Sequence, residues 1–284
     1  MTERDPAVGQ PASPLAPPGI DTTVAHPARM LNYVLGGTAN FPVDRETAER
    51  RLMVLPGWRT SAQQNRRFHA RAIRLLAGQA GITQFLDIGA GLPAAETVHG
   101  IAQAVNPACR VAYVDNDPLV LVHARTLLPS HPAGRISYSQ ADLREPDRIL
   151  ADPGVRGTLD FGQPVALMLL AVLHFIPDSD DPVGIVRTLL DALPTGSYLI
   201  ASHPTQDFDT QGSSPGRSEQ AIQVGNAAGV PAWLRTHAEF TAFFAGLDVL
   251  DPGVVLVSDW RPEPGQPRPA PHLVTCYGAV AGKP

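Results

Sequence analysis

A glycine loop behind an aspartate is the first segment whose residue types suit ligand binding. Residues 87–91 read Asp-Ile-Gly-Ala-Gly, and they stand where a short apolar run, 84–88, meets the start of a helical pattern. Glycines at such a junction let the chain turn tightly and let a ligand approach the main chain with no Cβ in the way. The segment predicts a ligand-binding turn in which Gly89, Ala90 and Gly91 face the ligand.

Two further carboxylates follow the next two apolar runs. Asp115 ends the run that starts at Arg110, and Asp142 follows the run 135–140. At the end of the second strand of a nucleotide-binding unit, a carboxylate can accept hydrogen bonds from both hydroxyls of a ribose. A carboxylate after the third strand is placed to accept the adenine amino group. The spacing therefore predicts a nucleoside site.

The charge of Asp87 helps to separate two classes of ligand. A dinucleotide site commonly has an apolar residue there, because its glycine turn receives a pyrophosphate. An acidic side chain disfavours a pyrophosphate and favours a cation, such as a sulfonium that also carries an α-ammonium group. The pattern Gly89-x-Gly91-x-x-Ala94 nevertheless satisfies the relaxed dinucleotide fingerprint, so an NAD(P)-dependent oxidoreductase is the alternative. Lys283 is the single lysine, which argues against lysine-dependent catalysis.

The elements that must position these residues alternate between strand and helix. Strands are predicted at 84–88, 110–114, 135–140, 164–173, 197–202, 247–257 and 272–280. Helices are predicted at 93–105, from Asp117-Pro118 onward, from Asp181-Pro182 to Leu193, and from the capping box Thr236-Glu239 to Ala245. This order predicts an α/β fold with a doubly wound, mostly parallel seven-stranded sheet of Rossmann-like type and an antiparallel edge pair.

A helical section is predicted before the first strand. Its helices are expected at 28–35, from an Asp44 cap to Leu55, and from a cap at Thr60 or Ser61 through Leu76. The predicted organisation is a disordered, proline-rich leader at 1–19, a helical N-terminal cap at 20–80, and a ligand-binding domain at 81–284.

Composition narrows the function classes. The 284 residues are 44% hydrophobic and carry a net charge of −5, which gives no basic footprint for nucleic acid. No apolar run reaches the roughly 18–20 residues that span a bilayer, and the first residues hold no signal-peptide core. No cysteine–histidine cluster suggests a metal. We expect a cytoplasmic protein without nucleic-acid or membrane partners, and the sequence predicts no particular oligomeric state.

Taken together, these motifs resemble those of class I S-adenosylmethionine-dependent methyltransferases. More narrowly, the chain resembles an actinobacterial family formerly catalogued as a domain of unknown function, the S-adenosyl methyltransferase family. The stretches that carry this resemblance are 28–41, 65–66, 87–93, 172–178 and 251–255. The resemblance extends from about residue 21 to the C-terminus.

The resemblance implies a role for each matching position. The loop 89–91 wraps the methionine part of S-adenosyl-L-methionine, and Asp87 meets its ammonium group. Asp115 binds the ribose. The adenine lies against Asn116, Asp142 and the Leu143 backbone, while Ala171 and His174 lie where such enzymes place the methyl group and its acceptor.

Several of these positions have two readings. Arg29, Tyr33 and Gly37 form a lid over the cofactor, or belong to a docking helix with an ordinary glycine C-cap. Asn65, beside Arg66, reaches the cofactor carboxylate or faces solvent. His174 is a catalytic base that takes a proton from the nucleophile, or a satisfied structural histidine.

The prediction is methyl transfer from S-adenosylmethionine to an oxygen or nitrogen nucleophile on a small-molecule acceptor. The alternatives are the NAD(P)-dependent oxidoreductase and a non-catalytic protein that binds S-adenosylmethionine or S-adenosylhomocysteine.

Overall fold

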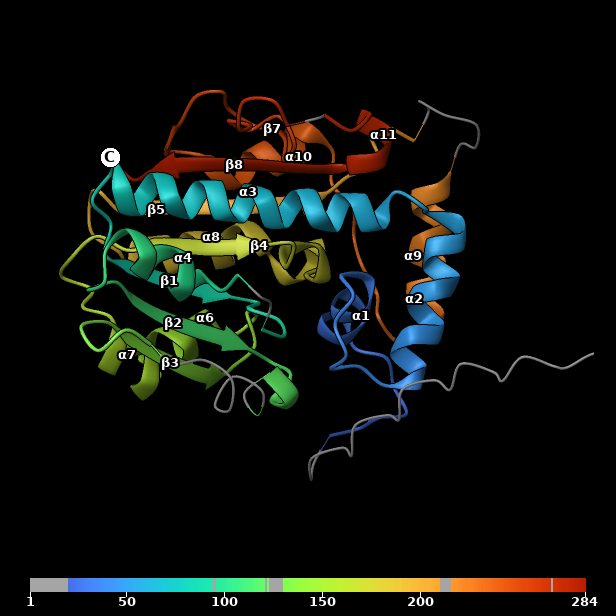
Figure 1. The fold of residues 1–284 in the computed structure, drawn as a ribbon, viewed down its shortest axis with the longest axis horizontal. Helices are drawn as coiled ribbons and strands as arrows, with labels where there is room; N and C mark the ends of the chain where they lie inside the picture. The colour runs from blue at the N-terminus through green and yellow to red at the C-terminus, as the bar shows by residue number, and fades with distance from the viewer. Residues whose placement is uncertain (1–19, 94–95, 121, 123–129, 210–215, 267) are drawn as a thin grey trace, which may run out of the picture.

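The computed structural model describes residues 20–93, 96–120, 122, 130–209, 216–266 and 268–284. A single sheet with the strand order β3-β2-β1-β4-β5-β8-β6 forms its centre, and β7 pairs with β8 (Figure 1). Strands β1 to β5 are parallel, and β8 runs antiparallel to β5, β6 and β7. The order reverses between β1 and β4, so a ligand crevice is expected at their carboxyl ends. The predicted leader lies outside the described residues.

The strands are β1 (Gln84–Ile88), β2 (Arg110–Asp115), β3 (Arg135–Gln140), β4 (Ala166–Leu170), β5 (Tyr198–Pro204), β6 (Asp248–Val249), β7 (Val255–Leu256) and β8 (Cys276–Gly282). The helices are α1 (Pro27–Val34), α2 (Pro42–Val54), α3 (Trp58–Gly78), α4 (Val98–Val105), α6 (Pro146–Ala151), α7 (Pro153–Thr158), α8 (Pro182–Asp191), α9 (Arg217–Ala227), α10 (His237–Thr241) and α11 (Pro271–Val274). Short 3-10 turns occupy Leu173–Phe175, Asp178–Asp180 and Ala242–Phe244.

The central strands are apolar because helices cover both faces of the sheet. Helices α3 and α4 lie on one face, and α6, α8 and α10 lie on the other (Figure 1). The continuous run Ala166–Leu169 in β4 is fully buried, as expected for a strand covered on both sides. The predicted fold class, a doubly wound and mostly parallel α/β sheet, is confirmed.

The N-terminal helices stand beyond the carboxyl ends of the parallel strands. Helices α1, α2 and α9 gather there, while α3 runs from α2 along the sheet (Figure 1). A second apolar cluster joins Met30 and Val34 of α1, Ala48 of α2 and Val230. In contrast, Phe68 of α3 belongs to the main core. The helical section thus shares its core with the sheet, and a domain boundary near residue 80 remains a prediction.

The described sheet has eight strands instead of seven, because the predicted strand 247–257 is interrupted. A cis Asp251–Pro252 bond and Gly253, at φ +90°, separate β6 from β7. The predicted strand 164–173 also ends early, at Leu170. Ala171 adopts φ +49°, which turns the chain out of the sheet.

Three predicted helix starts are wrong, each for a local reason. Helix α2 begins after Phe41, and Asp44 sits inside its first turn, where its carboxylate accepts the Phe41 backbone N–H at 2.8 Å. Helix α3 begins at Trp58 after Gly57, ahead of Thr60 and Ser61. Helix α4 begins at Val98 because the Thr97 side chain caps it.

Candidate functional site

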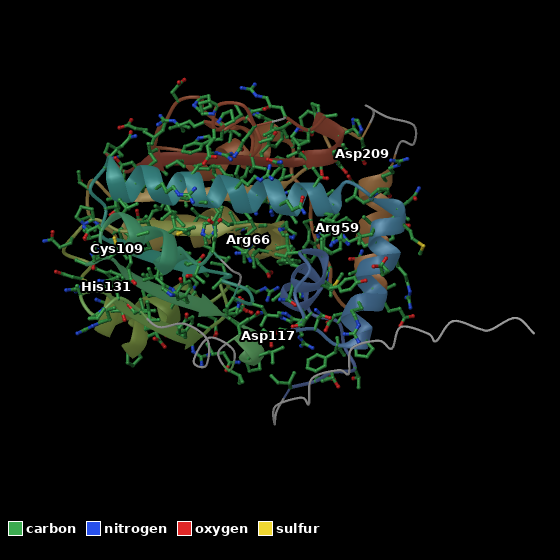
Figure 2. All side chains as sticks on the ribbon, in the orientation of Figure 1. Arg59, Arg66, Cys109, Asp117, His131 and Asp209 are labelled. Atoms are coloured by element: carbon green, nitrogen blue, oxygen red, sulfur yellow. The ribbon has the colours of Figure 1, made fainter. Side chains whose placement is uncertain are left out.

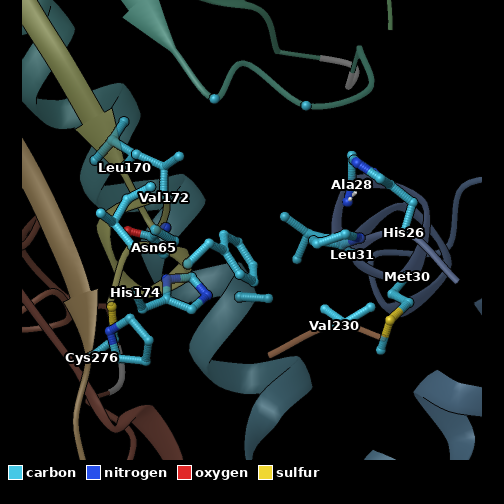
Figure 3. Close-up of a pocket in the computed structure, with 18 of the residues that line it drawn as sticks. His26, Ala28, Met30, Leu31, Asn65, Leu170, Val172, His174, Val230 and Cys276 are labelled. Atoms are coloured by element: carbon cyan, nitrogen blue, oxygen red, sulfur yellow. Dashed lines mark hydrogen bonds between the residues drawn. The ribbon is translucent and has the colours of Figure 1, made fainter. Parts of the chain in front are cut away.

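A cavity of about 480 Å³ opens at the carboxyl ends of the parallel strands. Leu170, Val172 and His174 lie on one side of it, and His26 and Leu31 lie on the other (Figure 3). The volume lies within the range of about 300–1,000 Å³ typical of small-molecule sites. The sheet therefore presents its ligand site where the strand order reverses.

The glycine loop forms the part of the cavity nearest β1. Gly89 has φ +78°, and a Cβ on it would lie 2.6 Å from Cγ2 of Val172. Gly91 also has a positive φ, +65°, but a Cβ there would meet nothing within 4 Å. The amides of Gly89 and Ala90 donate to the Val114 carbonyl. Gly89 is thus required by a close approach, whereas Gly91 is required by the turn.

Asp115 ties the loops after β1 and β2 together. Its Oδ2 accepts the Gly91 amide at 2.8 Å, and its Oδ1 accepts the Asp117 amide at 2.9 Å. Burial raises the pKa of Asp115, and these two amides oppose that shift. The carboxylate lines the cavity next to Asn116. It is held in place by backbone bonds while it faces the space where a ribose would lie.

Asp142 lies across the same part of the cavity, beside Leu143. Its carboxylate pairs with Arg144 at 3.0 Å, and Arg144 also pairs with Asp180 at 3.2 Å. These pairs join the loop after β3 to the turn at Asp178–Asp180, which follows β4.

Asp87 is a buried carboxylate that faces an arginine. It is 5% exposed, and burial raises its pKa to about 7, although the charge of Arg66 lowers it. Arg66 lies on α3, farther from α2 than Arg59 does (Figure 2). Both Asp87 and Arg66 line the cavity and interact electrostatically, so the site offers an acidic and a basic group together. That pair matches an amino-acid group, which carries both charges.

Beyond the glycine loop, four cavity residues keep a buried polar atom without a hydrogen-bond partner in the part of the chain that the structure describes. These atoms are Nε of Arg51, Oδ1 of Asn65, Nε2 of His69 and Nδ1 of His174. Buried polar groups in native proteins are nearly always bonded, so such a cluster calls for an explanation. Each of these four atoms has almost no accessible surface, so none of them faces the open space of the cavity directly.

His174 is neutral in this environment. It is 6% exposed, and burial together with the charges of His203, Arg51 and Arg235 lowers its pKa well below the usual value. It belongs to the 3-10 turn that follows the early end of β4. Ala171, at the bend, also lines the cavity.

Arg235, which our sequence reasoning missed, holds that turn in place. Its guanidinium donates to the carbonyls of Leu173 and Ile176, at 3.0 and 2.9 Å. It also contacts the Asp178 carboxylate at 2.7 Å and Nε2 of His203 at 3.0 Å. No local sequence signal marks this arginine, because its partners lie between 32 and 62 residues earlier in the chain. His203 is satisfied here and does not line the cavity.

Three residues predicted to bind the cofactor do not line the cavity. Arg29 is buried and pairs with Asp117 at 3.2 Å, which anchors α1 to the loop after β2. The Tyr33 hydroxyl donates to Glu49 on α2. A Cβ on Gly37 would lie 2.3 Å from the Asn32 side chain, so this glycine serves helix packing. The cavity wall on α1 comes instead from their neighbours, including His26, Ala28 and Leu31 (Figure 3).

The remaining predicted residues do line the cavity. They are Asn65, Asp87, Gly89, Ala90, Gly91, Asp115, Asn116, Asp142, Leu143, Ala171 and His174. The wall also contains residues that sequence reasoning did not select, among them Arg51, Trp58, His69, Val230 and Leu234.

Fold and site together define a doubly wound α/β protein with a cavity at the switch point of the sheet, lined by the predicted glycines and aspartates. The donor set fits S-adenosyl-L-methionine: Asp87 and Arg66 for the amino-acid group, Asp115 for the ribose, and Asp142 for the adenine. A buried carboxylate beneath the glycine loop does not fit a pyrophosphate.

Residues 14–284 match the model of the S-adenosyl methyltransferase family, and the chain belongs to that family. Among solved structures, a DUF574 family protein from Streptomyces avermitilis is 43% identical with a TM-score of 0.87, covering 93% of this chain and 99% of that one. A Thermobifida fusca protein is 37% identical with a TM-score of 0.83, covering 94% and 98%. No curated protein matches the chain.

The family confirms the resemblance drawn from the sequence. The chain is an S-adenosylmethionine-dependent methyltransferase, and S-adenosyl-L-methionine is its cofactor. The oxidoreductase and the non-catalytic alternatives are therefore set aside. Among the described helices, none is both long and apolar enough to cross a bilayer.

Proposed function

We propose that this methyltransferase acts on a nucleophilic oxygen or nitrogen of a small molecule. The observation that carries the proposal is a single cavity with two kinds of wall. One wall holds the aspartates and glycines suited to the cofactor, and the other holds the imidazole of His174. Both reactants can then share one enclosed space.

The cofactor would be held by residues already aligned in the free protein. Asp87 and Arg66 would take its ammonium and carboxylate groups, Asp115 its ribose, and Asp142 with Leu143 its adenine. When bound, S-adenosylmethionine supplies a methyl group on a sulfonium, which is already an activated donor. The protein then has mainly to align the acceptor with that methyl group.

His174 is suited to accept a hydrogen bond from the acceptor. Its lowered pKa keeps the ring neutral near pH 7, so one ring nitrogen can accept an O–H or N–H. A low pKa makes it a weak base toward a free hydroxyl group. A methylated oxygen or nitrogen that still carries its proton is far more acidic, and a weak base suffices to remove that proton. His174 would orient the nucleophile first and take the proton as transfer proceeds.

The size of the cavity supports a small acceptor. Its volume of about 480 Å³ must hold both the cofactor and the acceptor. The net charge of −5 also disfavours a nucleic-acid substrate.

The test is transfer of labelled methyl from S-adenosylmethionine to a panel of small phenols, amines and hydroxy acids, read by mass spectrometry. With an accepted substrate, His174→Ala should lower kcat by roughly 100-fold while S-adenosylhomocysteine affinity stays unchanged. His131→Ala is the control, since His131 is exposed and lies at the opposite end of the molecule from α1 (Figure 2). An unchanged kcat in His174→Ala would refute its role. Label found on protein or nucleic acid, with none on the panel, would refute a small-molecule acceptor.

A further inference from the structure

Arg51 is a buried cation with no carboxylate partner in the described part of the chain. It lies on α2, is 8% exposed and lines the cavity. Its guanidinium stacks over the Trp58 ring at 4.5 Å, and its Nε makes no hydrogen bond. The side chain thus places a planar, positively charged group in the cavity wall, although Nε itself has almost no accessible surface.

Burial without a counter-ion is unfavourable for such a group. Desolvation lowers the pKa of Arg51 to about 10, so it still carries its charge near pH 7. Charges removed from water are normally paired, because desolvation costs more than an aromatic face returns. The structure therefore keeps a charge here that a bound anion would stabilise.

The other arginines of the cavity wall already have anionic partners. Arg66 interacts with Asp87, and Arg144 pairs with Asp142 and Asp180. Arg51 is the cavity arginine that lacks such a partner among the described residues.

The charges of Arg66 and Arg51 act on different groups of the cavity. The charge of Arg66 acts on Asp87, which precedes the glycine loop. The charge of Arg51 acts on His174, at the acceptor wall. A cofactor held by Asp87 and Arg66 has its own carboxylate accounted for, which leaves Arg51 free for the acceptor.

Apolar side chains share the cavity wall with Arg51. Met30 and Leu31 come from α1, Trp58 opens α3, and Val230 and Leu234 come from the segment after α9. This lining favours an acceptor with an apolar body and one charged end.

We propose that the methyl acceptor is a small organic acid whose carboxylate pairs with Arg51 while its nucleophile faces His174. This proposal rests on the proposed function, since it places the acceptor in the same cavity. The carboxylate would meet the planar guanidinium, and the apolar body would lie against Trp58 and Val230.

The test compares matched acids and amides in the presence of saturating S-adenosylhomocysteine. Benzoate, phenylacetate and cinnamate are titrated against benzamide, phenylacetamide and cinnamamide by calorimetry. At least one acid should bind wild-type protein more tightly than its amide. Arg51→Gln should weaken the binding of that acid by roughly 10- to 100-fold and leave the affinity for the amide unchanged. Arg50→Gln is the matched control, because Arg50 is exposed on the same helix and pairs with Glu46.

A thermal scan of the free proteins separates binding from folding. Arg51→Gln should melt at or above the wild-type temperature, since it removes an unpaired buried charge. Arg51→Lys keeps the charge but loses the planar fork, and should retain part of the preference for the acid. A Tm well below wild type in both variants would show that Arg51 is structural and overturn the proposal.

The remaining outcomes separate the two proposals. If the protein binds S-adenosylhomocysteine but prefers no acid over its amide, the organic-acid acceptor is refuted. The proposed methyl transfer to a small molecule is then unaffected. An Arg51→Gln variant that loses S-adenosylhomocysteine affinity instead would assign Arg51 to the cofactor. Failure of wild-type protein to bind S-adenosylhomocysteine would overturn the function itself.

Discussion

The two halves of the cavity satisfy their polar groups in different ways. In the cofactor half, Asp115 accepts two backbone amides and Asp142 pairs with Arg144. On the rest of the wall, four residues keep a buried polar atom without a partner among the described residues: Arg51, Asn65, His69 and His174. The first half is preorganised by its own loops. The rest of the wall keeps unpartnered polar atoms just beneath its surface, so it is less completely satisfied by the chain itself.

Of the variants considered, Arg235→Met should have the largest effect, and it should affect the two halves of the cavity differently. It leaves the carbonyls of Leu173 and Ile176 and the ring of His203 without their buried donor. We expect a loss of about 3–5 kcal/mol in the free energy of unfolding, because a buried charged network is broken. Urea unfolding measures it, and Arg187→Met, an exposed position on α8, is the control.

The same variant should affect the two halves unequally. Below its melting temperature, S-adenosylhomocysteine affinity should change little, while methyl transfer is lost with the turn that carries His174. Equal losses in both measurements would contradict the separation of the two halves.

Gly89→Ala tests the backbone of the glycine loop in the proposed cofactor half. The added Cβ would press on Val172 at 2.6 Å, at a residue with φ +78°. The strain and the overpacking together should cost about 2–4 kcal/mol of stability and weaken cofactor binding. Gly246→Ala is the control, since Gly246 has φ +81° with nothing within 4 Å of a Cβ, and should cost about 1 kcal/mol. Equal Tm losses in the two variants would show that the Val172 side chain moves aside without cost, and would contradict the predicted overpacking.

The pH dependence of cofactor binding gives the smallest expected effect. Burial raises the pKa of Asp87 to about 7 in the free protein, and the cofactor's ammonium group requires the ionised carboxylate. As pH falls through 7 the carboxylate becomes protonated, so affinity should fall and approach about tenfold per pH unit. Calorimetry at pH 6, 7 and 8 measures this, and Asp87→Asn should bind weakly with a flat profile. A flat wild-type profile would mean that Asp87 does not meet the ammonium group.

The same contrast explains what the sequence could predict. The half proposed to hold the cofactor consists of residues that belong to short local patterns. These are a glycine turn after β1, Asp115 at the end of β2, and Asp142 after β3. Each pattern reports on its own strand end, and the sheet order brings these ends together. The parallel sheet and most of the cofactor wall were therefore predictable from residue types and spacing.

The acceptor half depends on contacts between distant segments. Arg51 comes from α2, His69 from α3, and Val230 from the segment after α9, and no spacing rule relates them. The family pattern at 28–41 includes α1, part of which lines the cavity, but it could not show which face of α1 does so. In the structure, Arg29 pairs with Asp117 and does not line the cavity, whereas its neighbour Ala28 does.

The central claim is that this cavity binds S-adenosylmethionine. Its most direct test is calorimetric titration of the wild-type protein and of Asp115→Asn with S-adenosylmethionine, S-adenosylhomocysteine and NADH. The account predicts that the first two bind with dissociation constants on the order of micromolar, that NADH does not bind, and that the variant weakens both by roughly 10- to 100-fold. Binding of NADH in preference to S-adenosylmethionine, or an Asp115→Asn variant that binds as tightly as wild type, would contradict it.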